Sequence, residues 1–402
     1  MNYGRGAGAR RRRQRDRRLL IAAAAGVLAV ILIVVLILVL RRRNAPDPVQ
    51  QPPLTQTETS EATAEPMLTI DTPQPTPATT PGPTVLDTSA NSVYRPVAEA
   101  GFLPVFDHSD TPENIIAITV DDVYQAENLQ TIVNVALDNG AKLTIFPVGE
   151  NAVKAEQADV LRFAWENGME LENHTMTHNG LYNCTDEELA WEIYQQNLSL
   201  SSILGVEYSV HFLRPKGGSA KDDQRIHAYC SQLGYAGIAH WKYSGSKNEI
   251  EDIKASLAPG TVYLFHTTNG DTQKLEEFIP YAVGQGYRLV TLNQMFGYPD
   301  NETAALTEPI EGRTAPALQP YDEAPVTYKR TTYAYGAYLL QQKLIALGYM
   351  SGEADGVYGK DSATAVSTFQ SSVGLPATGE ADPETQAKID ELFQIKFPNG
   401  IS

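Results

Sequence analysis

The pattern of apolar and polar positions divides the chain into distinct segments, and the first is one long apolar run. Leu19–Leu40 contains 22 residues without a polar side chain, enough to span a bilayer as a single helix. Eight Arg precede the run and Arg41–Arg43 follow it, which argues against both a buried core helix and a cleaved signal peptide. The excess of Arg before the run favours a cytoplasmic N-terminus. We therefore expect a basic cytoplasmic segment at 1–18 and a transmembrane signal anchor at 19–40.

Residues 41–93 have no hydrophobic period. Within them, residues 44–84 contain ten Pro and ten Thr, a composition typical of a disordered or semi-extended stalk. Such a stalk would hold the domains that follow it outside the cytoplasm, at some distance from the membrane.

Between residues 94 and 300, short apolar runs alternate with helical stretches. Thr185 and Glu188 have the spacing of a capping box, which predicts that a helix begins there. Seven strands in a βα series predict an α/β domain whose parallel sheet closes, or nearly closes, into a distorted (β/α)7-type barrel. The seven predicted strands are 115–120, 142–148, 169–173, 210–213, 236–240, 261–265 and 287–291.

The C-terminal part of the chain has a helical pattern. Residues 301–329 are rich in Thr, Ala, Pro and Glu, and predict a linker. Residues 330–396 then predict a small module of three helices with a turn at Asp355–Gly359. Its two apolar stripes are Leu340, Leu344 and Leu347, and Ala363, Val366, Phe369 and Val373.

Charge and cysteine content exclude some classes of protein. The net charge is −17, and residues 1–43 hold eleven Arg and one Asp, which leaves 20 basic and 47 acidic residues in 44–402. So acidic a body argues against a nucleic-acid partner. Cys184 and Cys230 are the only cysteines, too few for a disulfide scaffold or a thiolate zinc site. A single disulfide and two free thiols both remain open.

The first candidate functional residues lie at the end of the first strand, where Asp121 and Asp122 follow Ile115–Val120. Side chains of neighbouring residues on an extended chain point in opposite directions, so one acid could bind a metal while the other faces a reacting group. His174 and His178 are four residues apart, and on a helical turn both imidazoles would lie on one face, as two ligands of one metal require. Taken alone, each pair has a commoner explanation, a solvated turn or helix cap for the two acids and a coincidental surface pair for the two histidines.

Three more motifs follow predicted strands. Arg214 precedes a glycine pair that includes Gly217, Trp241 follows the fifth strand, and His266 ends the sixth. Each has an ordinary explanation as a turn, a core Trp or a structural His. In a barrel, however, successive strand ends meet on one face, where chemistry is usually found.

In this order and spacing the five motifs resemble the polysaccharide deacetylase family, carbohydrate esterase family 4, over roughly residues 94–300. The matching segments are Thr119–Asp122, His174–His178, Arg214–Gly218, the Trp241 segment and Leu264–His266. The resemblance implies hydrolysis of an N-acetyl group assisted by one divalent metal, most often Zn2+.

The resemblance also implies a role for each residue. The metal ligands would be Asp122, His174 and His178. The general base, the general acid and the partner of the base would be Asp121, His266 and Arg214. The residues that contact substrate would be Trp241, in the groove, and Gly217, whose backbone would help to bind the oxyanion.

Four positions depart from the family pattern. Val123 replaces a usual Gly, Lys216 a usual Pro, and Thr267 a frequent acid. Ser244 stands where an Asp commonly tunes the acid His. We expect Ser244 or a water to take over that role.

Residues Leu339–Leu375 resemble the peptidoglycan-binding domain 1 family, a three-helix module of cell-wall enzymes. Together the resemblances imply a membrane-anchored, extracytoplasmic deacetylase of peptidoglycan, acting on N-acetylglucosamine. N-acetylmuramic acid, another acetylated polysaccharide, and an inactive wall-binding scaffold are the alternatives. The implied partners are peptidoglycan strands and, through the anchor, the cell membrane.

Overall fold

The computed structural model describes residues 89–400. The predicted membrane helix at 19–40 and nearly all of the predicted stalk lie outside these residues, so both stay predictions. Within the described part of the chain, no helix is long and apolar enough to cross a membrane.

The fold is built on strand β2 (Ile115–Asp122), in which all eight residues are buried. Its run of β-branched residues suits a central strand, and it pairs in parallel with β3 (Thr144–Pro147) and β9 (Val262–His266). The strand order is β4-β3-β2-β9-β8, in which β4 is Glu170–Leu171 and β8 is Tyr243–Ser244.

A second parallel sheet has the order β1-β7-β6, formed by Val105–Phe106, Gly237–Ala239 and Phe212–Leu213. A single bridge between Asn173 and Leu213 joins it to the first sheet beyond β4. The barrel is therefore interrupted, as expected for a barrel with fewer than eight strands. β10 (Arg288–Leu289) pairs with the start of β2, so it does not form a further barrel strand next to β9.

All seven predicted strands are present, as β2, β3, β4, β6, β7, β9 and β10. Four short strands were not predicted: β1, β8, β5 (Val206–Tyr208) and β11 (Thr303–Ala305). The antiparallel pair of β11 with β5 lies partly inside the predicted linker.

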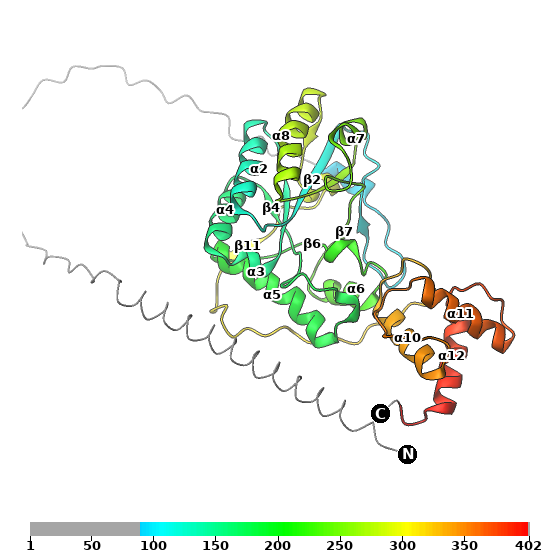
Figure 1. Ribbon diagram of the computed structural model, residues 1–402. Coiled ribbons are helices and arrows are strands. Elements are labelled where there is room, and N and C mark those ends of the chain that lie inside the picture. Colours follow the sequence, from blue (N-terminus) through cyan, green and yellow to red (C-terminus); the bar gives the residue numbers. More distant parts are fainter. Residues whose placement is uncertain (1–88, 401–402) are drawn as a thin grey trace, which may run out of the picture. The chain divides into compact units, whose positions relative to one another are not determined.

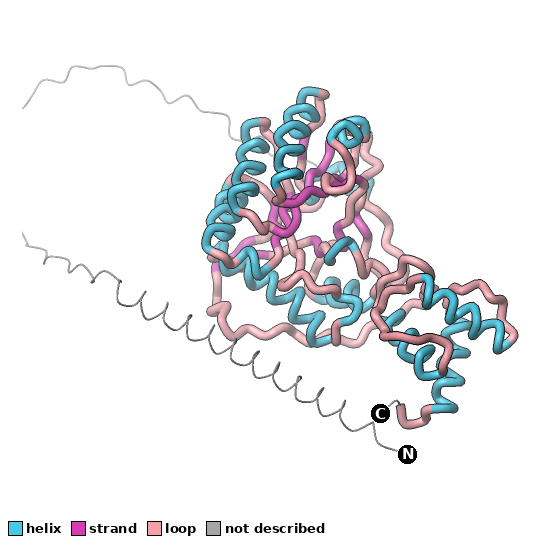
Figure 2. Tube along the Cα trace, in the orientation of Figure 1, coloured by secondary structure: helices cyan, strands magenta, loops and turns pink. Residues whose placement is uncertain are grey.

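Helices lie outside the strands (Figures 1 and 2). The capping box of Thr185 and Glu188 is confirmed at the start of the longest of these helices, α5. The helices of this domain are α2 (Ala126–Asp138), α3 (Gly149–Ala152), α4 (Ala155–Glu166), α5 (Asp186–Leu204), α6 (Gln224–Gln232), α7 (Ile250–Ala255), α8 (Asn269–Gly284) and α9 (Leu292–Phe296). Three short 3-10 helices are η1 (Ser89–Tyr94), η2 (Leu181–Asn183) and η3 (Lys216–Gly218).

The alternation along β2 sorts its side chains between two apolar cores. Ile116, Ile118 and Val120 join the larger core, which includes the outer helices. Ile115 and Ala117 join the smaller core, with Phe106, Phe146 and Phe212 from other strands. Because the period of a strand is two, Thr119 and Asp121 continue the row of Ile115 and Ala117.

The C-terminal module consists of α10 (Tyr335–Leu347), α11 (Lys360–Val373) and α12 (Pro383–Lys396). Both predicted stripes contribute to its core, in which Leu344, Val366 and Phe369 are fully buried. The preceding segment is held to the first domain. Arg313 forms two hydrogen bonds to Glu207 at 2.9 and 2.7 Å, and Tyr229 donates to the Pro316 carbonyl.

Candidate metal centre and active site

Asp121 lies at the end of β2 beside a fully buried arginine. Arg214, which follows β6, donates through one nitrogen to Asp121 Oδ1 and to Thr119 Oγ1, both at 2.7 Å. Its other terminal nitrogen donates to the His240 carbonyl, and its guanidinium lies 4.2 Å from the centre of the Phe146 ring. The expected pairing of Arg214 with Asp121 is therefore present. Because both groups are buried, removing either partner would leave the other as an unpaired buried charge.

The backbone turns sharply after Asp121. Asp122 and Val123 both have left-handed conformations, with φ of 73° and 58°. The expectation that the two acids point apart is wrong, because Asp122 is no longer extended. Both carboxylates approach His174 Nε2, at 3.5 Å for Asp121 and 3.3 Å for Asp122. The fold also shows why Gly is usual at position 123, since a β-branched residue is strained there.

The histidines lie on a loop after β4, so the expected helical turn is wrong. Thr175 and His178 have positive φ, and the loop closes through hydrogen bonds from the Thr175 N–H to Asn173 Oδ1 and from the His178 N–H to Thr175 Oγ1. The two imidazoles still come together, with ring centres 4.7 Å apart. The loop therefore brings the rings together without help from helical geometry.

Asp122, His174 and His178 fit a divalent metal. Their ligand atoms all lie within 4.8 Å of one another. Among the described residues, Asp122 Oδ1 is a buried atom without a hydrogen-bond partner, which is costly unless a cation or a proton satisfies it. His174 Nδ1 lies 2.6 Å from the Arg214 carbonyl, a contact that places the proton on Nδ1 and leaves Nε2 to bind a metal.

The electrostatics of His178 agree with a ligand role. Burial lowers its pKa, the nearby His174 lowers it further, and the pKa falls to about 4 in spite of Asp122. His178 is therefore neutral at physiological pH, the form in which imidazole binds metals.

His266 ends β9 directly beside the end of β2, and its Cα pairs in register with that of Asp121. Asp271 accepts hydrogen bonds from the His266 backbone N–H at 2.8 Å and from Nδ1 at 3.1 Å, both at its Oδ2. Burial alone would lower the pKa of His266. The Asp271 hydrogen bond and the charges of Asp121, Asp122 and Asp271 outweigh it, so this pKa is raised.

Asp271 is the functional residue that sequence reasoning missed. We expected Ser244 or a water in this position, but the Ser244 hydroxyl lies 3.0 Å from Ser246 Oγ, and Asp271 contacts His266 directly. A signal was available in Thr268–Asp271, which has capping-box spacing. Thr268 caps α8 by accepting from the Asp271 N–H, while the Asp271 carboxylate reaches back to His266.

The two predicted substrate-contacting residues lie on neighbouring loops. Trp241 is half-buried and stacks on His240, with ring centres 4.5 Å apart. Gly217 is exposed in η3 with φ of 63°. A Cβ on the next residue, Gly218, would lie only 2.6 Å from His240 Nε2 and 2.9 Å from Trp241, so glycine permits this close approach.

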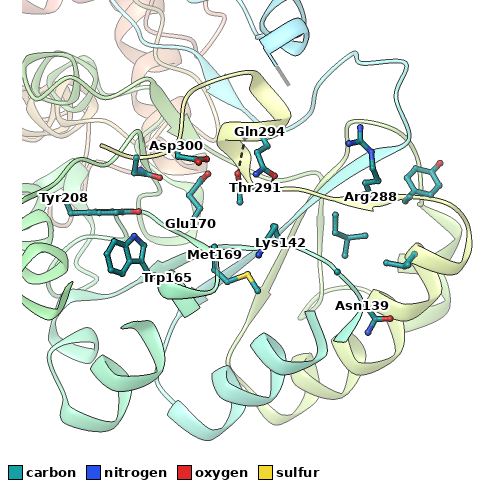
Figure 3. Close-up of a pocket in the computed structure, with 16 residues that line it drawn as sticks. Asn139, Lys142, Trp165, Met169, Glu170, Tyr208, Arg288, Thr291, Gln294 and Asp300 are labelled. Atoms are coloured by element: carbon teal, nitrogen blue, oxygen red, sulfur yellow. Dashed lines mark hydrogen bonds between the residues drawn. The ribbon is translucent and has the colours of Figure 1, made fainter. Parts of the chain in front are cut away.

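A cavity of 540 Å³ at the other ends of the strands is not part of this centre (Figure 3). It lies where β4 and β10 begin, next to Trp165 and Tyr208. Burial raises the pKa of Glu170 to about 7. Its oxygens accept from Thr144 Oγ1 and from the Asn293 N–H, and so hold α9 to the sheet. The role of Glu170 is therefore structural.

The cysteines are free thiols in the described part of the chain. Cys184 Sγ donates to the Gly180 carbonyl, and burial raises its pKa to about 11. Cys230 is fully buried, and burial raises its pKa as well. Of the two alternatives left by the sequence, the structure shows the free thiols.

Comparison with known proteins adds the family. Residues 108–238 match the family model for polysaccharide deacetylase. This chain contains a polysaccharide deacetylase domain. Residues 336–389 match the peptidoglycan binding domain, so the C-terminal helices are a peptidoglycan-binding module.

Two relatives of this chain are named as peptidoglycan deacetylases. A peptidoglycan-N-acetylglucosamine deacetylase of Bacillus cereus is 28% identical over 190 residues, which cover 45% of this chain and 68% of the relative. The peptidoglycan-N-acetylmuramic acid deacetylase PdaA of Bacillus subtilis is 23% identical, with 46% and 73% covered. A crystal structure of a CE4 family pseudoenzyme from Bacillus anthracis is 17% identical, covers 48% of this chain and 68% of that one, and has a TM-score of 0.43.

Proposed function

We propose that this protein hydrolyses the N-acetyl group of N-acetylglucosamine in peptidoglycan and releases acetate. The observation that carries the proposal is the constellation at the carboxyl ends of β2, β4, β6 and β9. A candidate metal triad lies there next to a buried, Arg-paired carboxylate and an Asp-paired imidazole. A metal site, a base and an acid on one face are what hydrolysis of an amide requires.

Each residue then has a chemical task. Asp122, His174 and His178 would hold the divalent metal, with Zn2+ as the proposed ion, which when bound supplies Lewis acidity to the acetyl carbonyl and lowers the pKa of water. Asp121, which pairs with Arg214, accepts a proton as water attacks the carbonyl carbon. His266 protonates the sugar nitrogen as the C–N bond breaks, and acetate and a free amine result.

The remaining parts of the chain support a wall polymer as substrate. The peptidoglycan-binding module is tied to the deacetylase domain, which concentrates the enzyme on an immobile polymer. We propose that residues 19–40 anchor the chain in the cell membrane, with the N-terminus in the cytoplasm and both folded domains outside. The apolar run and its flanking arginines support this placement.

The proposal can be tested on residues 44–402, loaded with zinc and incubated with purified peptidoglycan. Mass spectrometry of the released muropeptides should show loss of acetyl groups, abolished by a chelator and by Asp121→Asn. Fragmentation names the sugar and separates N-acetylglucosamine from N-acetylmuramic acid. No loss from protein that binds metal would indicate another acetylated polysaccharide. No loss and no bound metal would indicate a wall-binding scaffold.

A further inference from the structure

A second cavity lies on the outer side of the loop that carries Gly217. It has a volume of 370 Å³, within the range of small-ligand sites, and is formed between Lys216–Asp222 and the segment that enters α10. Both walls belong to the compact unit formed by residues 81–402. The residues that line it include Tyr182, Lys216, Lys221, Asp222, Thr331 and Tyr333.

Buried polar contacts fix the two walls against each other. Asp223 Oδ2 accepts a hydrogen bond from the Tyr335 N–H at 2.9 Å. Arg225 pairs with Asp223 and Asp186 and lies 3.7 Å over the Tyr335 ring. Asp223 and Arg225 are almost fully buried. The Tyr335 N–H bond to Asp223 and the contact of Arg225 with the Tyr335 ring hold the entry to α10 against the deacetylase domain, because separating the walls would leave Asp223 without one of its hydrogen-bond donors.

The lining favours a sugar that carries an acid. The rings of Tyr182 and Tyr333 meet edge to face, 5.5 Å apart, and both are partly exposed. Partly exposed aromatic rings offer apolar surface next to a polar hydroxyl, which suits the two-sided character of a sugar. Lys216 and Lys221 are exposed beside them, in a chain whose net charge is −17. Lysine ammonium groups bind carboxylates as point charges.

One acidic group also faces the cavity. Burial raises the pKa of Asp222, although Lys221 and the Tyr333 backbone N–H lower it. Asp222 is thus engaged with the backbone of the opposite wall. A ligand would meet this acidic group together with the two exposed lysines, which outnumber it.

The cavity adjoins the catalytic site through the loop itself. Lys216 follows Arg214 by two residues, and the Arg214 carbonyl lies 2.6 Å from Nδ1 of His174, so this loop begins beside the candidate metal site. On the same loop Gly218 packs against His240 and Trp241. A polymer bound at the metal site can therefore reach the cavity with a neighbouring unit.

We propose that this cavity is a subsite for the carboxylate-bearing unit of the peptidoglycan strand, adjacent to the sugar that is deacetylated. The proposal rests on the proposed function for its choice of polymer. In peptidoglycan every second sugar carries a lactyl group extended by a peptide, so a carboxylate lies next to each N-acetylglucosamine. The peptidoglycan-binding module then supplies one wall of the substrate site through Tyr333, in addition to retaining the enzyme on the wall.

The test is equilibrium binding to the full chain carrying Asp121→Asn, measured by calorimetry so that no turnover is needed. The probes are the neutral N-acetylglucosamine tetramer, a disaccharide–tripeptide, and the same disaccharide with only its lactyl carboxylate. We expect the tripeptide-bearing disaccharide to bind about tenfold more tightly than the tetramer, the scale of one charge-assisted contact. The third probe tells whether the lactyl or the peptide carboxylate is recognised.

Lys221→Gln should remove this preference, whereas Lys247→Gln, at an exposed lysine of another loop, should keep it. Tyr333→Ala should weaken both acidic probes and Tyr333→Phe should not, with thermal melting to confirm that the variants are folded. Equal binding of neutral and acidic probes, or an unchanged preference in Lys221→Gln, would overturn the subsite. Absence of acetate release by the wild type would overturn the proposed function instead and leave the binding result intact.

Discussion

Asp271→Asn tests the arrangement around the proposed general acid. The substitution keeps the size of the side chain and its ability to accept from the His266 N–H, but removes the charge that faces His266 Nδ1 at 3.1 Å. The pKa of His266 is raised although burial opposes this, and the Asp271 hydrogen bond leads the groups that raise it. The variant should therefore have a lower His266 pKa.

The size of the effect follows from the contact. A hydrogen bond to a charged group contributes about 1.5–3 kcal/mol, and one pH unit corresponds to about 1.36 kcal/mol. Because the Asn side chain can still accept a hydrogen bond and the His266 side chain is 23% exposed, the lower end applies, a fall of about one pH unit. A bound divalent cation would offset the charges of Asp121 and Asp122, so Asp271 would account for a larger part of the rise in the His266 pKa.

The sign of the pH dependence is fixed by the role of the imidazole. A general acid must be protonated, so activity falls as pH rises above its pKa. In Asp271→Asn the fall in activity at alkaline pH should therefore begin at a lower pH than in the wild type. In the pH range where activity is falling, kcat/KM of the variant should be about tenfold below that of the wild type, and at more acidic pH the difference should be smaller. The raised His266 pKa also stabilises the fold below pH 6.5, a contribution that is lost as pH rises through the folded pKa. The substitution should accordingly lower Tm more at pH 6 than at pH 9.

The assay is acetate release from peptidoglycan between pH 5 and pH 10, with metal content measured for each sample. Ser244→Ala is the matched control, because its hydroxyl contacts Ser246. Its profile should coincide with that of the wild type. The reasoning is refuted if Asp271→Asn keeps the wild-type alkaline limb or moves it upwards, or if Ser244→Ala shifts it.

Three further predictions concern the same site and the thiols. His174→Ala should abolish stoichiometric metal binding, measured by elemental analysis, and metal retained by this variant would contradict the assignment of His174 as a ligand. Asp121→Asn should instead keep the metal and lose acetate release. Arg214→Met leaves Asp121 buried and unpaired, so unfolding should need about 3–5 kcal/mol less in denaturant titration, and an unchanged midpoint would contradict the pairing. Reduction should not change the alkylation pattern of the protein, because Cys184 and Cys230 are free, and a gain of two alkylated sites on reduction would show a disulfide.

Patterns within short segments could be interpreted correctly from the sequence. The apolar run Ile115–Val120 predicts a buried strand, and the capping box at Thr185 predicts the start of α5; both are present because they depend on nearby residues. The family motifs also placed Asp121, Arg214 and His266 at strand ends that meet on one face. A parallel sheet brings its carboxyl ends together whatever its detailed geometry.

Other features depended on the tertiary structure. The left-handed turn at Asp122 and Val123 reverses the direction expected for the second acid, and a loop replaces the helical turn expected between His174 and His178. A strained backbone persists only where surrounding contacts hold it, and such contacts cannot be read from local sequence.

The sequence by itself thus determined the order of the strands along the chain, the family and the set of reactive side chains, because each is encoded in short motifs. Only the tertiary structure decided which groups touch. It shows that Asp271, and not Ser244, is the partner of His266. It also places Tyr333 beside Tyr182, which lies 151 positions earlier in the chain. Such contacts join residues that are far apart in the sequence or lie on different elements, and only the packing of those elements fixes the distances between them.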